Sequence, residues 1–167
     1  MIIGIAGRAG AGKSTIAEML VKALGGGTHV KIIPFAKPLK EFARKLGWDG
    51  NKDAKGRRLL QLLGTDVGRE CIDEDIWVKH WCSLCDDALR DGYNHILVDD
   101  MRFPNEIAAV LSRGGIVLQV AGRGYDNIDT SHPSEQTLVH DSFTKIDNSG
   151  DTQDLEKKIQ DLCHSFT

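Results

Sequence analysis

Short apolar runs alternate with helix-like stretches along this chain, and that alternation limits the folds it can adopt. Each run is rich in Ile, Val or Leu and is bounded by Gly, Asp or Asn, as buried parallel strands are. Strands separated by helices predict an α/β fold, in which a five-stranded parallel sheet is flanked by helices. The expected strands are Ile2–Ala6, Val30–Pro34, His95–Asp99, Ile116–Ala121 and Phe143–Asp147.

The segments between these strands repeat apolar residues at helical spacing. The first ends at Gly25-Gly26-Gly27, a strong signal for a helix C-terminus. Because the alternation continues from end to end, we expect a single domain over residues 1–167. Two polar stretches interrupt it, and we expect a mobile loop at Gly47–Gly56 and a lid at Gly122–Pro133. The expected helices are Ser14–Leu24, Pro38–Leu46, Leu59–Cys71, Glu74–Arg90, Asn105–Arg113 and Leu155–His164.

Composition narrows the class of protein. The net charge of -3 argues against a nucleic-acid binder that relies on a broad basic face. No apolar stretch reaches the roughly 18 residues of a membrane span, and the N-terminus has no basic region of a signal peptide. Four cysteines are too few and too unevenly spread for a disulfide scaffold. We therefore expect a cytoplasmic protein that binds neither membrane nor nucleic acid.

Two further groups of residues are expected to be structural. Cys82 and Cys85 have the spacing of metal ligands, but they lie inside a helical pattern and no second close pair exists. Trp77 and Trp81 lie one helical turn apart, which favours a place in the core or at an interface. We expect neither group to bind a ligand.

The residues Gly7-Arg8-Ala9-Gly10-Ala11-Gly12-Lys13-Ser14 match the pattern G-x-x-x-x-G-K-[ST] directly after the first strand. Glycines let the backbone turn so that several N–H groups face one centre, where a helix N-terminus adds partial positive charge. We expect Lys13 to reach the β- and γ-phosphates of ATP and the Ser14 hydroxyl to bind Mg²⁺. The expected nucleotide contacts are Gly7, Gly10, Ala11, Gly12, Lys13, Ser14 and Thr15.

The third strand ends in two adjacent acids followed by an arginine. Asp99 and Asp100 reach the edge of a parallel sheet beside the glycine-rich loop, where a carboxylate can hold Mg²⁺ or orient an attacking oxygen. Arg102 can bind an anionic phosphate through two parallel hydrogen bonds. Asp and Asn residues here are also suited to cap the following helix, and both roles can hold.

Five blocks of the sequence, in order, resemble the phage-type deoxynucleoside monophosphate kinases, a branch of the P-loop nucleotide kinases. Together they span about four-fifths of the chain, and the third and fourth are more specific than the glycine-rich loop alone. The resemblance implies a P-loop fold, with an acceptor-binding region at about 35–92 and a short lid at about 122–135. The blocks are Gly7–Ser14, Phe35–Lys40, Leu60–Thr65 with Arg69, Asp100–Glu106 and His132–Glu135.

The resemblance also implies roles for single residues. Phe35 and Gln61 would contact the acceptor's base, although Phe35 could equally be core, and Lys37, Arg69 and Arg102 would hold its phosphate. Asp100 matches the strand-end aspartate of the family, and Asp99 precedes it, so the metal ligand is left open between them. Arg123 in the lid would join Lys13, Asp100 and Arg102 in catalysis, and Asn148 would lie beside the adenine unless it only forms a turn.

We therefore expect a phosphotransferase that moves the γ-phosphate of ATP to a nucleoside monophosphate, with a deoxynucleotide as acceptor. Two alternatives stay open. One is a kinase of another small phosphorylated acceptor, such as dephospho-coenzyme A or phosphomevalonate. The other is a nucleotide-dependent switch that does not transfer phosphate. A homodimer is also left open.

Overall fold

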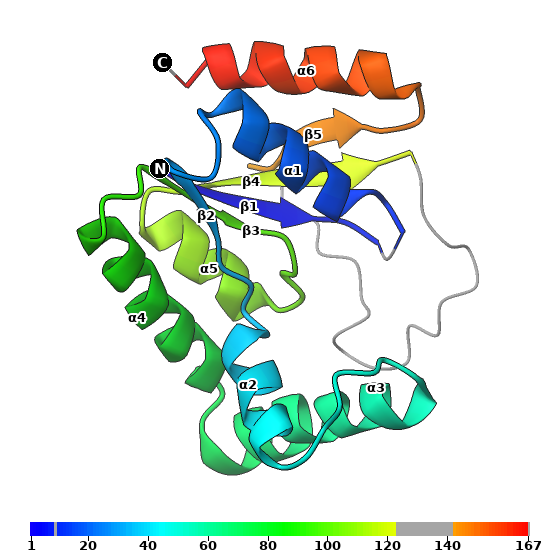
Figure 1. The fold of residues 1–167 in the computed structure, drawn as a ribbon, viewed down its shortest axis with the longest axis vertical. Coiled ribbons are helices and arrows are strands. Elements are labelled where there is room, and N and C mark those ends of the chain that lie inside the picture. Colours follow the sequence, from blue (N-terminus) through cyan, green and yellow to red (C-terminus); the bar gives the residue numbers. More distant parts are fainter. Residues whose placement is uncertain (9, 123–141, 167) are drawn as a thin grey trace.

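The computed structural model describes residues 1–8, 10–122 and 142–166. Its centre is one parallel sheet in the order β2-β3-β1-β4-β5, so the first strand of the chain lies in the middle (Figure 1). The predicted α/β class and the five strands are confirmed, and every strand boundary falls within two residues of its expected place. The strands are β1 (Ile2–Ala6), β2 (Val30–Ile32), β3 (His95–Val98), β4 (Ile116–Ala121) and β5 (Thr144–Asp147).

Helices cover both faces of the sheet. On one face α1 (Lys13–Ala23) and α6 (Thr152–His164) pack together, and on the other lie α4 (Ile76–Arg90) and α5 (Pro104–Ser112) (Figure 1). Strand β1 is buried along its whole length because side chains from both of its faces enter a core. Ligands of such sheets bind beyond the carboxyl ends of the strands, and here those ends meet the start of α1 and of α5.

The remaining helices form a separate arm. After β2 come α2 (Lys37–Lys45), α3 (Ala54–Gln61) and the π-helix η1 (Leu62–Ile72). These three helices lie below the sheet in the view of Figure 1. The prediction of one helix at Leu59–Cys71 was wrong in its start and in its type. The helix begins inside the expected Gly47–Gly56 loop because Asp53 accepts a hydrogen bond from the Gly56 N–H at 2.7 Å and caps it.

The residues that were expected to be structural lie in helix α4. Trp81 is fully buried and donates its Nε1–H to the Ile33 carbonyl at 2.8 Å, and Trp77 donates to the Gly64 carbonyl at 2.7 Å. Cys85 is buried in the same helix, and burial raises the pKa of its thiol to about 12. The two tryptophan hydrogen bonds join α4 to the end of β2 and to η1. They confirm the prediction that both tryptophans belong to the core.

Within the described parts of the chain, no helix combines the length and the apolar character that a membrane crossing requires.

Candidate active site

The glycine-rich loop connects the end of β1 to the start of α1. Gly10 and Gly12 have φ angles of 76° and 92°, a left-handed backbone that side chains with a Cβ rarely adopt. The Lys13 ammonium donates hydrogen bonds of 2.9 Å to the carbonyls of Gly7 and Arg8 and so folds back over the loop. Ser14 and Thr15 are exposed on the first turn of α1, and Ala9 lies outside the described residues.

Asn148 holds this loop from the end of β5. The residue is 5% exposed, and its side-chain Nδ2 donates a hydrogen bond of 2.8 Å to the Ala11 carbonyl. Its backbone N–H bonds to the Ala121 carbonyl at 2.8 Å, which fixes the residue against β4. A Cβ on Gly12 would lie 2.5 Å from the same Nδ2, so the glycine is required here by close approach as well as by its φ angle.

The two acids at the end of β3 have different surroundings. The Asp99 Oδ2 lies 3.5 Å from the Ser14 Oγ, across the gap between β3 and α1. Asp100 turns the other way, and its two oxygens accept the backbone N–H groups of Phe35 and Ala36 at 2.8 and 3.0 Å. Burial raises the pKa of Asp100, although these two N–H donors oppose the rise. Asp99 therefore faces the loop, while Asp100 holds the chain between β2 and α2.

Lys40 belongs to the same charged group, although sequence reasoning did not select it. Its pKa is lowered by burial, and the nearby Asp100 and Asp99 carboxylates partly offset that effect. Lys37 lies half-buried at the start of the same helix, and residues three apart on a helix share a face. That spacing is the signal that could have linked Lys40 to the site.

Arg69 lies in a buried ion pair. Its Nη2 is 2.6 Å from the Glu106 Oε1, and the two side chains are 7% and 4% exposed. The other Glu106 oxygen accepts the backbone N–H groups of Arg102 and Phe103 at 2.6 and 3.1 Å. Burial raises the pKa of Glu106 to about 7 and lowers that of Arg69, against the attraction between them. The pair thus joins η1 to the turn that carries Arg102.

Sequence reasoning gave Glu106 no role of its own. The signal was present, because a glutamate three residues after a helix N-cap commonly bonds the N-cap backbone. Here Phe103 is the N-cap of α5, and Glu106 occupies that third position. Its pairing with Arg69, 37 residues away, has no local pattern in the sequence.

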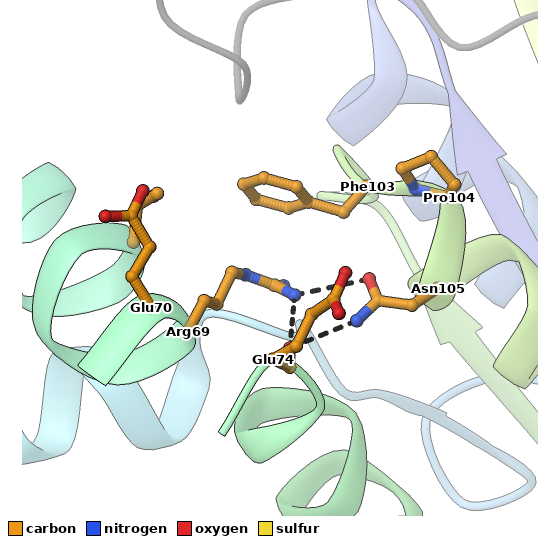
Figure 2. Close-up of a pocket in the computed structure, with 7 residues that line it drawn as sticks. Arg69, Glu70, Glu74, Phe103, Pro104 and Asn105 are labelled. Carbon is orange, nitrogen blue, oxygen red and sulfur yellow. Dashed lines mark hydrogen bonds between the residues drawn. The ribbon is translucent and has the colours of Figure 1, made fainter. Parts of the chain in front are cut away.

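A cavity of about 420 Å³ opens between η1 and the start of α5. Figure 2 shows the Phe103 ring above the Arg69 guanidinium, with Glu70 on the opposite side of the open space. The guanidinium carbon lies 3.9 Å from the ring centroid. The cavity is lined by Thr65, Arg69, Glu70, Glu74, Phe103, Pro104 and Asn105.

The other expected acceptor residues are more scattered. Phe35 is 2% exposed, and its ring packs on Trp81 with centroids 4.5 Å apart, which agrees with the alternative that it belongs to the core. Gln61 is partly exposed at the end of α3, and Arg102 is exposed just after β3. The lid residues Arg123, His132, Ser134 and Glu135 lie outside the described residues.

Comparison with known proteins points to one family. The deoxynucleotide monophosphate kinase of Enterobacteria phage T4 is 34% identical over 105 residues, which cover 62% of this chain and 43% of that protein. The enzyme of the same name from Escherichia phage RB69 is 28% identical over 139 residues, covering 83% and 54%. A protein of Acanthamoeba polyphaga mimivirus is 28% identical over 163 residues, covering 83% and 82%. The chain spans about half the length of the two phage relatives.

The family's own sequence profile gives the most direct assignment. The profile described as deoxynucleotide monophosphate kinase matches residues 41–159. This range contains η1, both acids after β3, the Arg69–Glu106 pair and Asn148. Because the match covers more than half of the sequence, the chain belongs to the deoxynucleotide monophosphate kinase family.

Proposed function

We propose that this protein transfers the γ-phosphate of ATP to a deoxynucleoside monophosphate, giving ADP and the deoxynucleoside diphosphate. The observation that carries the proposal is the meeting of the Gly7–Ser14 loop, Asp99 and Arg102 at one edge of the sheet. Membership of the family supports it, and two phage relatives are named for this activity.

In the proposed reaction an oxygen of the acceptor's phosphate attacks the γ-phosphorus while the bond to the β–γ bridging oxygen breaks. That acceptor oxygen is already anionic, so the protein needs no strong base and contributes positioning and charge neutralisation. Lys13 would exchange its bonds to the loop carbonyls for the β- and γ-phosphates. Arg102 and Lys37 would hold the acceptor's phosphate, with Lys40 beside them. Arg123 would cover the transferring group from the lid.

Ser14 and Asp99 fit a magnesium ion. Mg²⁺ prefers oxygen donors and is commonly bound by one or two protein groups together with water and substrate phosphates. The Ser14 hydroxyl and the Asp99 carboxylate offer two such oxygens 3.5 Å apart. When bound there, the ion would neutralise charge on the phosphate oxygens. We assign Asp100 a different role, which is to fix the connection between β2 and α2.

Asn148 would serve the nucleotide through the loop. Its side-chain amide is already bonded to the Ala11 carbonyl, so it would shape the backbone that receives the phosphates rather than contact the adenine. The remaining loop residues, Gly7, Gly10, Gly12 and Thr15, would contribute backbone groups around the phosphates.

The test is an ADP-formation assay with a panel of acceptors. We expect at least one of the four deoxynucleoside monophosphates to stimulate ADP formation far above the rate with ATP alone. Dephospho-coenzyme A and phosphomevalonate test the rival kinases, and stimulation by one of these alone would overturn the substrate assignment. A switch protein predicts no stimulation by any acceptor.

The variant Lys13→Ala tests the loop. Removing the ammonium should lower kcat/KM by roughly 10²–10³-fold, the usual loss when a preorganised electrostatic contact to the reacting group is removed. Lys22→Ala is the matched control, because Lys22 is exposed on the same helix and its nearest acid, Glu156, is 3.9 Å away. Equal turnover in the Lys13 variant and the control would contradict the proposal.

A further inference from the structure

Asn148 is a buried polar residue whose side chain bonds to the glycine-rich loop. Three polar or charged residues are buried within the described parts of the chain, and two of them, Arg69 and Glu106, bond to each other. Asn148 instead donates its Nδ2 to the Ala11 carbonyl, 137 residues away in the sequence. A buried amide is costly unless it is hydrogen-bonded, so the folded protein keeps this contact.

The contact decides which way one peptide group of the loop faces. The Ala11 carbonyl and the Gly12 N–H belong to the same planar trans peptide, so they point in opposite directions. Because the carbonyl is directed to the Asn148 Nδ2, the Gly12 N–H points away from Asn148. This N–H forms no hydrogen bond within residues 1–8, 10–122 and 142–166. Gly12 is the N-cap of α1, where an unbonded N–H suits an anion.

Local hydrogen bonds fix the backbone on both sides of this peptide, but not the peptide itself. The Ala11 N–H bonds to the Arg8 carbonyl at 3.1 Å, and the Gly12 carbonyl accepts the Ile16 N–H at 3.0 Å. Glycine tolerates φ angles of either sign, so the peptide between Ala11 and Gly12 could otherwise rotate. A rotated peptide would turn its carbonyl oxygen toward the phosphates and repel them. Asn148 is therefore the group that sets this orientation.

Asn148 is held in place independently of the loop. Its backbone N–H bonds to the Ala121 carbonyl at the end of β4 at 2.8 Å. The preceding Asp147 accepts the Ser149 N–H and hydroxyl at 3.0 and 2.9 Å, and its carbonyl accepts the Lys158 ammonium at 3.0 Å. The amide is thus presented from a turn that is bonded to β4 and α6, so it can restrain the loop.

We propose that Asn148 is a positioning residue for the leaving group, which holds the Ala11 carbonyl outward and aims the Gly12 N–H at the β-phosphate of ATP. This inference rests on the proposed function. As the bond between the γ-phosphorus and the bridging oxygen breaks, its electron pair stays on the β-phosphate of ADP. A donor aimed there in advance gains strength in the transition state, so its loss lowers kcat more than it raises the KM of ATP.

The variant Asn148→Asp tests this hydrogen bond with little change in shape. It replaces the Nδ2 donor by an oxygen, which repels the Ala11 carbonyl when ionised and donates to it when protonated. We expect kcat for the stimulating acceptor to fall about 10–100-fold at pH 8, the scale of a small misplacement of a catalytic group. Relative to the unmodified protein, this loss should shrink about fivefold or more at pH 5.5, because burial favours the protonated carboxyl.

Two further variants serve as controls. Asn148→Ala removes the donor and offers no other, so its kcat should be low at both pH values. Asn94→Asp adds the same charge at an exposed residue before β3, at the other end of the sheet, and should keep the kcat of the unmodified protein. Urea unfolding at both pH values establishes that each variant is folded under the assay conditions.

Calorimetric titration with ADP and with ATP, both in the presence of magnesium, provides a second readout that does not need turnover. The β-phosphate of ADP carries the charge of the departed group, so Asn148→Asp at pH 8 should weaken ADP binding about tenfold and ATP binding less. This difference supports the role of Asn148 even if no acceptor stimulates ADP formation, in which case the proposed function alone fails.

Two results would overturn the role of Asn148 and leave phosphate transfer standing. One is an equal loss of kcat in Asn148→Asp at pH 8 and pH 5.5, which would show that the hydrogen bond to Ala11 does not matter for the reaction. The other is a raised KM of ATP with unchanged kcat, which would limit Asn148 to the binding of the donor.

Discussion

Asp99 and Asp100 are adjacent carboxylates in different surroundings. Asp99 lies 3.5 Å from the Ser14 hydroxyl, whereas both oxygens of Asp100 accept backbone N–H groups. Sequence reasoning could not decide between them because side chains alternate between faces only within a strand. Strand β3 ends at Val98, so the orientation of the next two residues depends on the loop. Only the partners of each acid separate the two roles.

Exchanging each acid for its amide should separate these roles in an experiment. Asp99→Asn should leave stability nearly unchanged and raise the Mg²⁺ concentration for half-maximal activity by about 10–100-fold, a range typical of altered metal environments. Asp100→Asn should destabilise the protein by roughly 1–3 kcal/mol, because the new amide group faces a backbone N–H that loses its acceptor. Urea unfolding and magnesium titration of the ATP-dependent reaction measure the two effects.

The two variants are controls for one another. The assignment would be contradicted if Asp100→Asn changed the magnesium requirement and Asp99→Asn changed the unfolding midpoint.

Phe35 and Lys40 lie beside the same carboxylates, and they illustrate the limit of residue-level prediction. A buried aromatic and a ligand-binding aromatic look alike in a sequence, and only the contact of Phe35 with Trp81 assigns it to the core.

At the scale of elements, the strands were predictable because apolar runs between glycines and acids have few alternatives in an α/β chain. The arm after β2 was less predictable. Its polar, glycine-containing sequence resembles a loop, so the N-cap at Asp53 is not recognised. Helical periodicity also does not distinguish the α-helix α3 from the wider turn of the π-helix η1. The contact of η1 with α5 could not be predicted from the sequence, because it depends on the ion pair between Arg69 and Glu106, which are 37 residues apart.

Removing Arg69 should show how strongly this pair holds the two elements together. Arg69→Met leaves the Glu106 carboxylate buried without its cation, and breaking a buried pair in this way costs about 3–5 kcal/mol. The loss should be smaller at pH 5 than at pH 8. Burial already raises the pKa of Glu106 to about 7, and without Arg69 it should rise further, so at pH 5 the group is neutral. Urea unfolding at both pH values measures the difference.

Arg90→Met provides the control, because Arg90 also pairs with an acid, at 2.5 Å, but on the exposed surface of α4. It should cost less than about 1 kcal/mol. If the two variants were equally stable, or if the Arg69 variant lost the same free energy at pH 5 and pH 8, Glu106 would not be the buried partner that it is here.

For the whole molecule, His95 at the start of β3 and Glu106 in the first turn of α5, beyond the other end of that strand, should give opposing contributions to stability as the pH changes. Glu106 binds a proton more readily in the folded state than in the unfolded state, so its contribution to stability falls as pH rises from about 4.5 to about 7. His95 has the opposite sign. It begins β3, its Nδ1 is buried without a hydrogen-bond partner among the described residues, and burial lowers its pKa below the ordinary 6.5.

The unfolded chain therefore takes up a proton at His95 before the folded protein does. The stability that neutral His95 contributes is fully present above pH 6.5 and is lost as the pH falls through that value toward the lowered pKa. Replacing His95 by Gln should remove this loss. We compare the free energy of unfolding of His95→Gln with that of the unmodified protein. This difference should shift in favour of the variant as the pH falls from 7.5 to 5.5, by about 1.4 kcal/mol for each unit by which folding lowers the pKa of His95.

Urea unfolding at pH 7.5 and 5.5 measures this change, and His80→Gln, an exposed histidine on α4, supplies the baseline. Because Glu106 favours the acidic side of the same window, the His95 variant should gain more stability on acidification than the unmodified protein does. If the free energy of unfolding had the same pH dependence in His95→Gln and His80→Gln, the surroundings of His95 at the start of β3 would not disfavour its protonation. The buried Nδ1 would then have access to water or to a donor from the rest of the chain.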